Sequence, residues 1–417
     1  MESSRPRVIL FTETFPGPGG EASFLPSEVD ILAERFSLEI VPLRMTLGAR
    51  LTVPEGVNVN YGLSRAVARR TYRIVCLIRS VVDARVYREI RAQRPLSLRP
   101  RGLMTVIVRN ARAHAVEAWV SRELGSPKGR ETALLYSWWS SSTGLGVVRA
   151  GRRSGATVVT RAHGYDLFAD QEVAGFVPFQ SELLRKANCV ASVSHAGVDY
   201  LARLYPQSAD HVTVSYLGVL GQAHRNTAPS GTTVRLVSCS TVVPVKRVEL
   251  IVDAIVLLVR DGVDVFWTHM GGGPGLPALR QLVEARPELA GRVDLPGQLV
   301  PEAVMAWYRD HPADAIVNVS ASEGLPVSLM EAASLGIPMI ATAVGGTPEI
   351  VDESCGRLLP ADPSPYEVAA VLAQFARLSP AERTAMREAS HERWASRFSA
   401  ERNYGEFADL LFGLADQ

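Results

Sequence analysis

Short runs of apolar, largely β-branched residues recur along this chain, and the segments between them have helical periodicity. In the first half these runs occupy residues 8–11, 38–43, 133–137, 157–160, 189–192 and 212–216. The pattern restarts at residues 234–238, 265–270, 293–295, 315–319 and 339–344. Strands that alternate with helices in this way form parallel sheets covered by helices. The chain is therefore predicted to be an α/β protein with two doubly wound, Rossmann-like domains.

A polar stretch separates the two series of runs. Residues 218–233 show no periodicity and include the sequence RNTAPSG at 225–231, which is typical of a linker. With 417 residues, of which 47% are hydrophobic, the chain is also too long for one core. We expect an N-terminal domain at residues 1–220, a C-terminal domain at 221–390, and a terminal helix at 391–417 that packs back across the domains.

Composition excludes several classes of function. A formal net charge of +1 provides no overall field for nucleic acid, so no nucleic-acid partner is expected. The four cysteines form no C-x-x-C pair and no cluster with histidine, so neither a zinc site nor a disulfide framework is predicted. No apolar run has the length of a signal peptide or of a membrane span. A cytoplasmic protein is the resulting prediction.

The region 315–331 has the most specific chemistry. An apolar strand at 315–319 is followed by a polar loop and by a helix expected to have Pro326 at its first position. The first-turn N–H groups and the positive end of the helix dipole suit a diphosphate. Glu323 lies in the loop and Glu331 lies in the helix, about 7.5 Å along its axis from Pro326. One carboxylate could bind ribose and the other could bind sugar hydroxyls.

The E-x7-E spacing of these glutamates, with Gly-Leu-Pro inside it, resembles the signature of family 4 glycosyltransferases, which have the GT-B fold of two parallel-sheet domains facing a central cleft. The resemblance extends across most of the chain. It implies that Glu323 contacts the donor sugar and that Glu331 contacts the ribose of the nucleotide. It places further donor contacts at Gly324, Leu325, Pro326 and Val327. The plain alternative is two surface glutamates.

A lysine follows the first strand of the second domain, in the sequence VVPVKRVE at 242–249. This segment resembles the part of the family whose lysine binds the donor pyrophosphate, which makes Lys246 the candidate for stabilising the leaving group. Relatives commonly carry an arginine where this chain has Thr241, so phosphate binding would depend on Lys246 alone or also recruit Arg247. No Asp-x-Asp motif is present, so metal-independent chemistry is expected, with no cofactor besides the donor.

Two loops of the first domain also resemble the family pattern. The sequence TRAHGYD at 160–166 corresponds to a loop at the reacting centre, which implies that His163 lies beside the donor sugar. Asp166 could orient His163, contact the acceptor or cap a turn. The glycine-rich loop at 15–21 corresponds to the acceptor side, with Gly19 and Gly20 nearest the donor. A structural histidine and an ordinary turn are the alternatives.

Further turns of the second domain match the family as well. The resemblance implies contacts of the nucleotide base with the backbone at Gly297, Gln298 and Leu299. A glycine-rich turn at 271–275 and a Gly-Gly turn at 345–346 follow two other predicted strands. A dinucleotide-binding dehydrogenase would need a different glycine spacing and a turn in the first domain.

Arginine is concentrated in one segment of the first domain. Residues 65–112 contain thirteen arginines against Asp83 and Glu89, interleaved with valine, isoleucine and leucine. This pattern fits a helical face that rests on an anionic membrane and meets a lipid-linked acceptor. A solvated helix face fits it equally well.

These observations together predict a retaining glycosyltransferase that moves a sugar from a nucleotide-diphosphate sugar to a hydroxyl acceptor, with a resemblance to the branch that builds bacterial exopolysaccharides. Two alternatives stay open. One is a nucleotide-sugar 2-epimerase of the same fold. The other is a catalytically degenerate partner subunit, for which Thr241 in place of arginine is the main argument.

Overall fold

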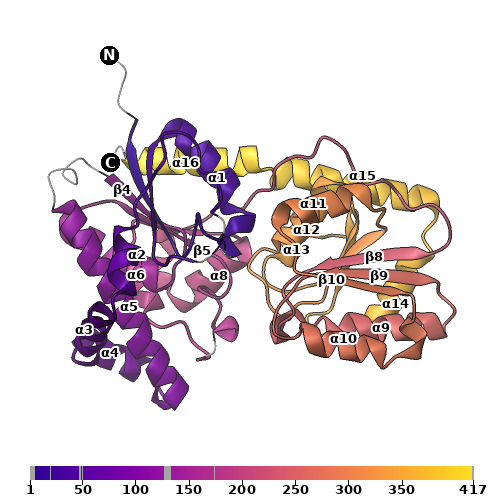
Figure 1. Cartoon of the computed structure of the whole chain (residues 1–417), viewed down its shortest axis with the longest axis horizontal. Helices are drawn as coiled ribbons and strands as arrows, with labels where there is room; N and C mark the ends of the chain where they lie inside the picture. The colour runs from indigo at the N-terminus through magenta and orange to yellow at the C-terminus, as the bar shows by residue number, and fades with distance from the viewer. Residues whose placement is uncertain are drawn as a thin grey trace. The chain divides into compact units, whose positions relative to one another are not determined.

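The computed structural model describes residues 5–18, 20–46, 48, 50–125, 133–172 and 174–415. Its internal contacts divide the chain into two units (Figure 1). Unit 1 comprises Met1–Leu217 together with Asn403–Gln417, and unit 2 comprises Gly218–Arg402. Each unit is an α/β domain built on one sheet, so the predicted α/β class with two Rossmann-like domains is confirmed.

The sheet of unit 1 has seven parallel strands in the order β3-β2-β1-β4-β5-β6-β7. Every run predicted in this half is a strand. The short edge strand β3 was missed, because two residues carry no readable alternation. The strands are β1 (Arg7–Thr12), β2 (Ser37–Pro42), β3 (Asn58–Val59), β4 (Ala133–Ser137), β5 (Val158–Ala162), β6 (Cys189–Ser192) and β7 (Val212–Val214).

Helices connect these strands, and the long helix α5 packs closely against α6. A β-carbon added at Gly146 of α6 would lie 2.6 Å from both Ala113 O and Val116 Cβ of α5, so only glycine permits this approach. The helices of this part of the chain are α1 (Leu25–Arg35), α2 (Gly62–Ala68), α3 (Arg70–Val81), α4 (Ala84–Ala92), α5 (Pro100–Leu124), α6 (Ser142–Ser154), α7 (Gln180–Lys186) and α8 (His195–Leu204).

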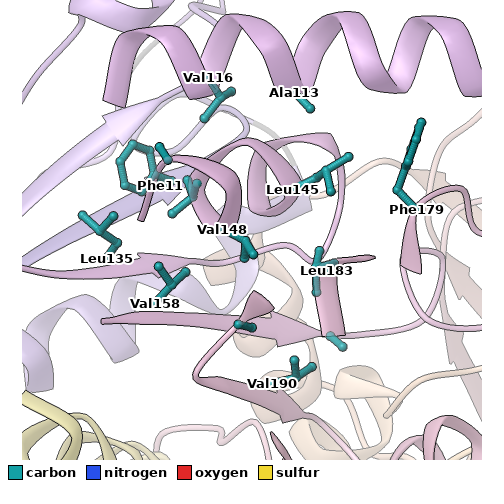
Figure 2. Close-up of a cluster of buried hydrophobic side chains, with 14 of the residues drawn as sticks. Phe11, Ala113, Val116, Leu135, Leu145, Val148, Val158, Phe179, Leu183 and Val190 are labelled. Atoms are coloured by element: carbon teal, nitrogen blue, oxygen red, sulfur yellow. The ribbon is translucent and has the colours of Figure 1, made fainter. Parts of the chain in front are cut away.

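The core of unit 1 lies between the sheet and helices α5, α6 and α7. Figure 2 shows Phe11 and Val158 of the sheet together with Val116 of α5 and with Leu145 and Val148 of α6. All five side chains are buried. Apolar residues on successive turns of each helix produce this continuous contact with the strands.

A second group of buried side chains in unit 1 is polar. Arg161 on β5 donates from Nε to the Tyr136 hydroxyl at 2.9 Å, and its Nη2 lies 3.3 Å from Glu28 Oε2. Tyr136 in turn donates to Glu28 Oε1 at 2.7 Å. The guanidinium also lies 4.1 Å from the ring centroid of Phe407, on helix α16 (Ala400–Ala415). Burial raises the pKa of Glu28 above its ordinary value, against the effects of Arg161 and Tyr136.

The sheet of unit 2 has six parallel strands in the order β10-β9-β8-β11-β12-β13. The five runs predicted here are strands, and the edge strand β13 is an addition. The strands are β8 (Val234–Cys239), β9 (Val265–Met270), β10 (Val293–Gly297), β11 (Ala315–Asn318), β12 (Met339–Thr342) and β13 (Gly356–Leu359).

Helices cover this second sheet around a core that includes Trp267, Ile255 and Phe375. Helices α14 and α15 each begin with a capping box, at Ser364 and Ser379 respectively. The helices are α9 (Glu249–Arg260), α10 (Leu276–Glu284), α11 (Pro301–Asp310), α12 (Val327–Ser334), α13 (Thr347–Ile350), α14 (Pro365–Ala376) and α15 (Pro380–Arg397). None of the helices in the described ranges has the length and hydropathy needed to cross a membrane.

Candidate functional site

The loops that carry the predicted donor-binding residues meet at the carboxyl edge of the unit 2 sheet. Backbone hydrogen bonds connect these loops although they are far apart in sequence. Ala321 N donates to Val245 O at 2.7 Å, and Gly271 N donates to Gly297 O at 2.9 Å. In parallel sheets this edge is where ligands bind. Tertiary structure therefore assembles one polar surface from the ends of β8, β9, β10 and β11.

Two of the predicted residues form the centre of this surface. Lys246 ends a short 3₁₀ turn after β8, and its Nζ donates to Glu323 Oε1 at 2.6 Å. The amide of Asn318, at the end of β11, donates to the same oxygen at 3.2 Å. Glu323 is buried, whereas Lys246 keeps about a quarter of its side chain exposed. The ammonium group is thus held in place by a buried carboxylate, on a side chain that is partly exposed.

Arg247 has a different set of contacts. Its backbone adopts the left-handed conformation, with φ of 47° and ψ of 37°. Its guanidinium donates to Val319 O at 2.8 Å and to Ser320 O and Ala361 O at 2.9 Å each, and it pairs with Asp362 at 2.7 Å. These bonds fasten the start of the loop that carries Glu323. The side chain of Arg247 therefore holds that loop in place.

Helix α12 follows this loop. It begins at Val327, one residue later than predicted, because Pro326 has an extended ψ of 102° and stands at the N-cap. Leu329 N donates to the carbonyl of the N-cap Pro326 at 3.1 Å, which leaves the N–H groups of Val327 and Ser328 as the first-turn donors without an acceptor in the helix. Glu331, one turn further along, is partly buried, and desolvation raises the pKa of its carboxyl to about 7.

Gly345 of the turn after β12 allows the Glu323 loop to pack closely. Its φ is +50°, and a β-carbon built there would lie 1.8 Å from the carbonyl oxygen of Glu323. The next residue, Gly346, donates its N–H to Gly324 O at 3.0 Å. The predicted contact at Gly324 is therefore part of a tight junction between two loops.

The three residues predicted to line the nucleotide base lie at the end of β10. Gly297 has a φ of +83°. Gln298 Oε1 accepts from Gly272 N at 3.1 Å, and its Nε2 donates to Leu299 O at 3.1 Å. These bonds connect the β10 loop to the glycine-rich turn after β9. Among the described residues, no group of three His, Cys, Asp or Glu side chains is placed to hold a metal ion.

In unit 1, His163 follows β5 in a pocket of aromatic rings. Its ring centroid lies 4.3 Å from that of Trp139 and 5.0 Å from that of Trp138. The residue is 7% exposed, and neither ring nitrogen has a hydrogen-bond partner among the described residues. Desolvation lowers the pKa of the imidazole, which favours its neutral form. Such a buried, unpaired imidazole is suited to a hydroxyl of a ligand.

Asp166 accepts backbone hydrogen bonds in the loop that carries His163. Its carboxylate accepts the N–H of His163 and the N–H of Ser140, each at 2.8 Å, and lies 3.8 Å from the His163 ring. The turn-capping alternative therefore describes it best. Its contacts fix the loop in which His163 stands.

Sequence reasoning missed Glu21, which organises the loop after β1. Its carboxylate accepts the backbone N–H groups of Glu13, Thr14 and Phe15 at 2.8, 2.8 and 2.9 Å. It also accepts from Trp139 Nε1 at 2.7 Å. Trp139 could have been found from its position just after a strand, whereas nothing local distinguishes Glu21 from a surface glutamate.

The glycine loop that precedes Glu21 was predicted to approach the donor. Gly20 begins a 3₁₀ turn, and a β-carbon added there would meet nothing within 4 Å. Gly19 lies outside the described residues. The close backbone approach expected of this loop thus stays a prediction.

Comparison with known proteins gives one family match. Residues 233–377 match the family model "Glycosyl transferases group 1". Over 275 residues the chain is 25% identical to the "Putative colanic acid biosynthesis glycosyltransferase WcaL" of Salmonella typhimurium, and over 278 residues it is 26% identical to the protein of the same name in Escherichia coli. The matches cover 64% and 65% of this chain and only 65% and 66% of the relatives' length.

Solved structures are similar over nearly the whole chain. The Anabaena protein HepE, determined in complex with UDP and glucose, superposes with a TM-score of 0.65 and 17% identity, covering 97% of this chain and 99% of that one. Similarity at this level of identity concerns the fold, which is the GT-B fold in both proteins.

Proposed function

We propose that this chain transfers a sugar from a nucleotide-diphosphate sugar to a hydroxyl acceptor, because residues 233–377 match the model of group 1 glycosyltransferases and the fold is the GT-B fold. The observation that carries this proposal is the Lys246–Glu323 pair beside the start of α12. It combines a fixed cation, a carboxylate and the first-turn amides of Val327 and Ser328 within one unit. Departure of a diphosphate requires such positive groups near the leaving oxygens.

Lys246 supplies the charge for the leaving group. An ammonium group has three N–H donors, and the bond to Glu323 occupies one of them. The others can therefore bind phosphate oxygens while Glu323 keeps the side chain in position. The family that the sequence resembles commonly has an arginine where this chain has Thr241, so in this proposal Lys246 is the main cationic contact of the diphosphate, with the amides of α12 as further donors.

Glu331 and Glu323 bind the two ends of the donor. We assign the ribose hydroxyls to Glu331 and the sugar hydroxyls to Glu323, since carboxylates accept strong hydrogen bonds from hydroxyl groups. The backbone from Gly324 to Val327 lies between them along the chain, and the loop from Gly297 to Leu299 binds the base. His163 contacts a sugar hydroxyl through a ring nitrogen.

The stereochemical outcome in this proposal is retention. A double displacement needs an unengaged carboxylate at the reacting carbon. The carboxylate next to His163, Asp166, is already bonded to two backbone amides. Attack on the same face, assisted by the phosphate of the donor, avoids the need for an enzymic nucleophile. A metal ion is not required, because Lys246 and α12 stabilise the diphosphate.

The relatives narrow the choice of substrates. WcaL carries the description of a colanic acid biosynthesis glycosyltransferase, and HepE was determined with UDP and glucose. We therefore propose a UDP-sugar as donor, a saccharide as acceptor and a role in exopolysaccharide assembly.

The test is a transfer assay with UDP-glucose, UDP-galactose and GDP-mannose as donors and oligosaccharides as acceptors. We expect release of nucleotide that depends on acceptor, persists in EDTA and forms a product whose anomeric configuration equals that of the donor by NMR. A sugar product formed from donor alone would indicate a 2-epimerase instead. Donor binding without turnover on any acceptor would indicate a degenerate subunit.

A further inference from the structure

One face of the unit 2 sheet carries polar side chains near the start of its strands. Arg235, Phe266 and Asp294 are each the second residue of their strand, in β8, β9 and β10 respectively. Arg235 pairs with Phe266, and Asp294 pairs with Thr268, two residues beyond Phe266. Because paired residues of parallel strands point to the same face, and side chains alternate along a strand, all four lie on one face. A fully covered face of a parallel sheet would carry apolar residues instead.

Helix α11 lies over this face, on the side opposite to α9 and α10 (Figure 1). Its last turn carries Trp307, and His311 follows at the C-cap, four residues later. The two rings stack, with centroids 4.8 Å apart and an angle of 5° between their planes. The Nδ1 atom of His311 lies 3.1 Å from the carbonyl oxygen of Trp307, which can only accept, so Nδ1 donates and Nε2 is left as an acceptor. This bond holds the two rings parallel.

A cavity of about 280 Å³ lies between the stacked rings and the sheet. Its volume is close to the lower end of the range for small-molecule sites, which begins at about 300 Å³. Three aromatic rings, an arginine, an aspartate and a threonine line it: Trp307, His311, Phe266, Arg235, Asp294 and Thr268. The cavity therefore suits a small ligand that has both an apolar face and polar groups.

The guanidinium of Arg235 is available to such a ligand. It lies 5.9 Å from the centroid of the Phe266 ring and has no hydrogen bond or ion pair with a side chain of the described ranges. The carboxylate of Asp264 acts on it electrostatically, but that carboxylate is already bonded to Arg292. The side chain of Arg235 is exposed, so its N–H donors can turn toward a molecule in the cavity.

The acceptors of the cavity are available as well. The side chains of Asp294 and Thr268 have no hydrogen-bond or ion-pair partner in the part of the chain that the structure describes. Thr268 is 3% exposed and borders the cavity, where a bound molecule can reach its hydroxyl. Polar groups in such positions normally have partners, which a ligand would supply.

These groups select a neutral molecule with hydroxyl groups. Arg235 and Asp294 carry opposite charges, so the cavity has no net charge that would favour an anion or a cation. Arginine donates and aspartate accepts, and adjacent hydroxyls of a sugar ring use both kinds of group. The negative face of the Trp307 ring attracts the polarised C–H groups of a sugar. A nucleobase can stack on Trp307 too, but it has no adjacent hydroxyls for the arginine and the aspartate.

We propose that this cavity binds one unit of a neutral saccharide, at a site separate from the donor residues. Trp307 stacks on the sugar ring, Arg235 donates to its hydroxyls, and Asp294 accepts from them. The donor-binding loops follow the carboxyl ends of the strands, whereas Arg235 lies four residues before the end of β8 at Cys239, about 13 Å along the strand. The statement that this unit belongs to the acceptor or product chain rests on the proposed function, but the binding itself does not.

The test is saturation-transfer NMR on the full chain, with cellobiose, lactose and maltose as neutral probes and uridine monophosphate as an anionic probe. Each titration is made with and without saturating UDP, which separates this cavity from the donor site. The variants are Trp307→Leu, which keeps an apolar side chain, and Arg235→Gln, which keeps hydrogen-bond donors without the charge. The matched controls are Tyr366→Leu and Arg377→Gln, an exposed tyrosine of α14 and the exposed arginine at its C-cap.

We expect at least one disaccharide to bind in the presence of UDP, with a Kd raised on the order of tenfold in Trp307→Leu and in Arg235→Gln and by less than about twofold in the controls. Since Arg235 is exposed, Arg235→Gln keeps the fold and reads the site even if Trp307→Leu destabilises α11.

The proposal is overturned if none of the disaccharides binds, if Arg235→Gln binds them as the wild type does, or if only uridine monophosphate binds. Loss of saccharide binding on addition of UDP would overturn it as well, because the sugar would then occupy the donor site. UDP binding is measured separately, so its absence would count against the proposed function and not against the saccharide site.

Discussion

The Nζ atom of Lys246 lies 2.6 Å from Oε1 of Glu323, so two loops that are 77 positions apart in the sequence meet through one charged hydrogen bond. The Glu323 side chain is buried, whereas about a quarter of the Lys246 side chain is exposed at the carboxyl edge of the sheet. Because Glu323 fixes the Lys246 ammonium group before the reaction, this cation need not reorganise when a diphosphate leaves.

Replacing Lys246 by methionine removes the cation and retains the length of the side chain. We expect kcat to fall on the order of a hundredfold or more with a smaller change in donor affinity, because the charge acts mainly on the developing diphosphate. The matched control is Lys186→Met, since Lys186 also bonds a glutamate, Glu182, at 2.6 Å but lies on α7 in unit 1. Steady-state kinetics with a UDP-sugar check this, and equal effects in both variants would remove Lys246 from the mechanism.

The Glu331 carboxyl predicts a pH dependence of stability. Its pKa is about 7 in the folded chain and about 4.5 when unfolded, so the folded state retains the proton between these values. Stability therefore falls as pH rises through this window and levels off above it, with a loss of at most about 3 kcal/mol. Urea unfolding of wild type and Glu331→Gln at about pH 5 and about pH 8 checks this. If the free energy of unfolding of the variant changed with pH as much as that of the wild type, the prediction would be contradicted.

The same carboxyl makes donor binding depend on pH. Ribose hydroxyls donate to the ionised form, so donor affinity is expected to rise between about pH 6 and about pH 8. The Glu331→Gln variant should bind the donor weakly and with little pH dependence. Calorimetric titration with UDP measures both effects. The control is Glu284→Gln on α10, which should behave as the wild type does.

A side chain at position 345 is expected to weaken donor binding without unfolding the protein. A methyl group at this position would collide with the Glu323 carbonyl, which forces the loop that carries Glu323 to move. We expect Gly345→Ala to weaken donor binding by at least about tenfold, since misplacing a positioned group by a short distance has effects of this size. Gly405→Ala, where a β-carbon meets nothing within 4 Å, is the control. Full affinity in Gly345→Ala would show that the close packing of the two loops is dispensable.

Removing one partner of the buried ion pair between Arg161 and Glu28 is expected to lower the stability of unit 1 strongly. Glu28→Ala leaves Arg161 charged and buried without its acidic partner, and we expect a loss of about 3–5 kcal/mol. The exposed pair of Arg35 and Asp409, which are 2.5 Å apart, provides the comparison, and Asp409→Ala should cost at most about 1 kcal/mol. Native-state hydrogen exchange of the β1, β4 and β5 amides reads the stability of this unit. Similar protection in both variants would argue against a structural role for the pair.

Much of the site could be predicted because its residues follow buried strands. Apolar runs identify strands, and the edge at which parallel strands end is known before the structure is seen, so Lys246, Glu323 and His163 could be assigned to loops. The contacts of Arg247 could not be predicted, and for Asp166 the sequence left three roles open, among them the turn cap. Arg247 donates to backbone carbonyls of another loop, and Asp166 accepts backbone N–H groups of its own loop and of a second one. Such partners depend on which loops come together in the fold.

The sequence by itself determined the class of fold, the order of the strands along the chain and the chemical types available at their ends, because these follow from local patterns of apolar and polar residues. Only the tertiary structure decided which of these residues meet, which histidine nitrogens stay unpaired and which side chains share a cavity. A helical pattern shows that a helix has an apolar face, but not what that face lies against. Contacts between distant segments settle that question, and they also created the cavity beside Trp307 and the raised pKa of Glu331.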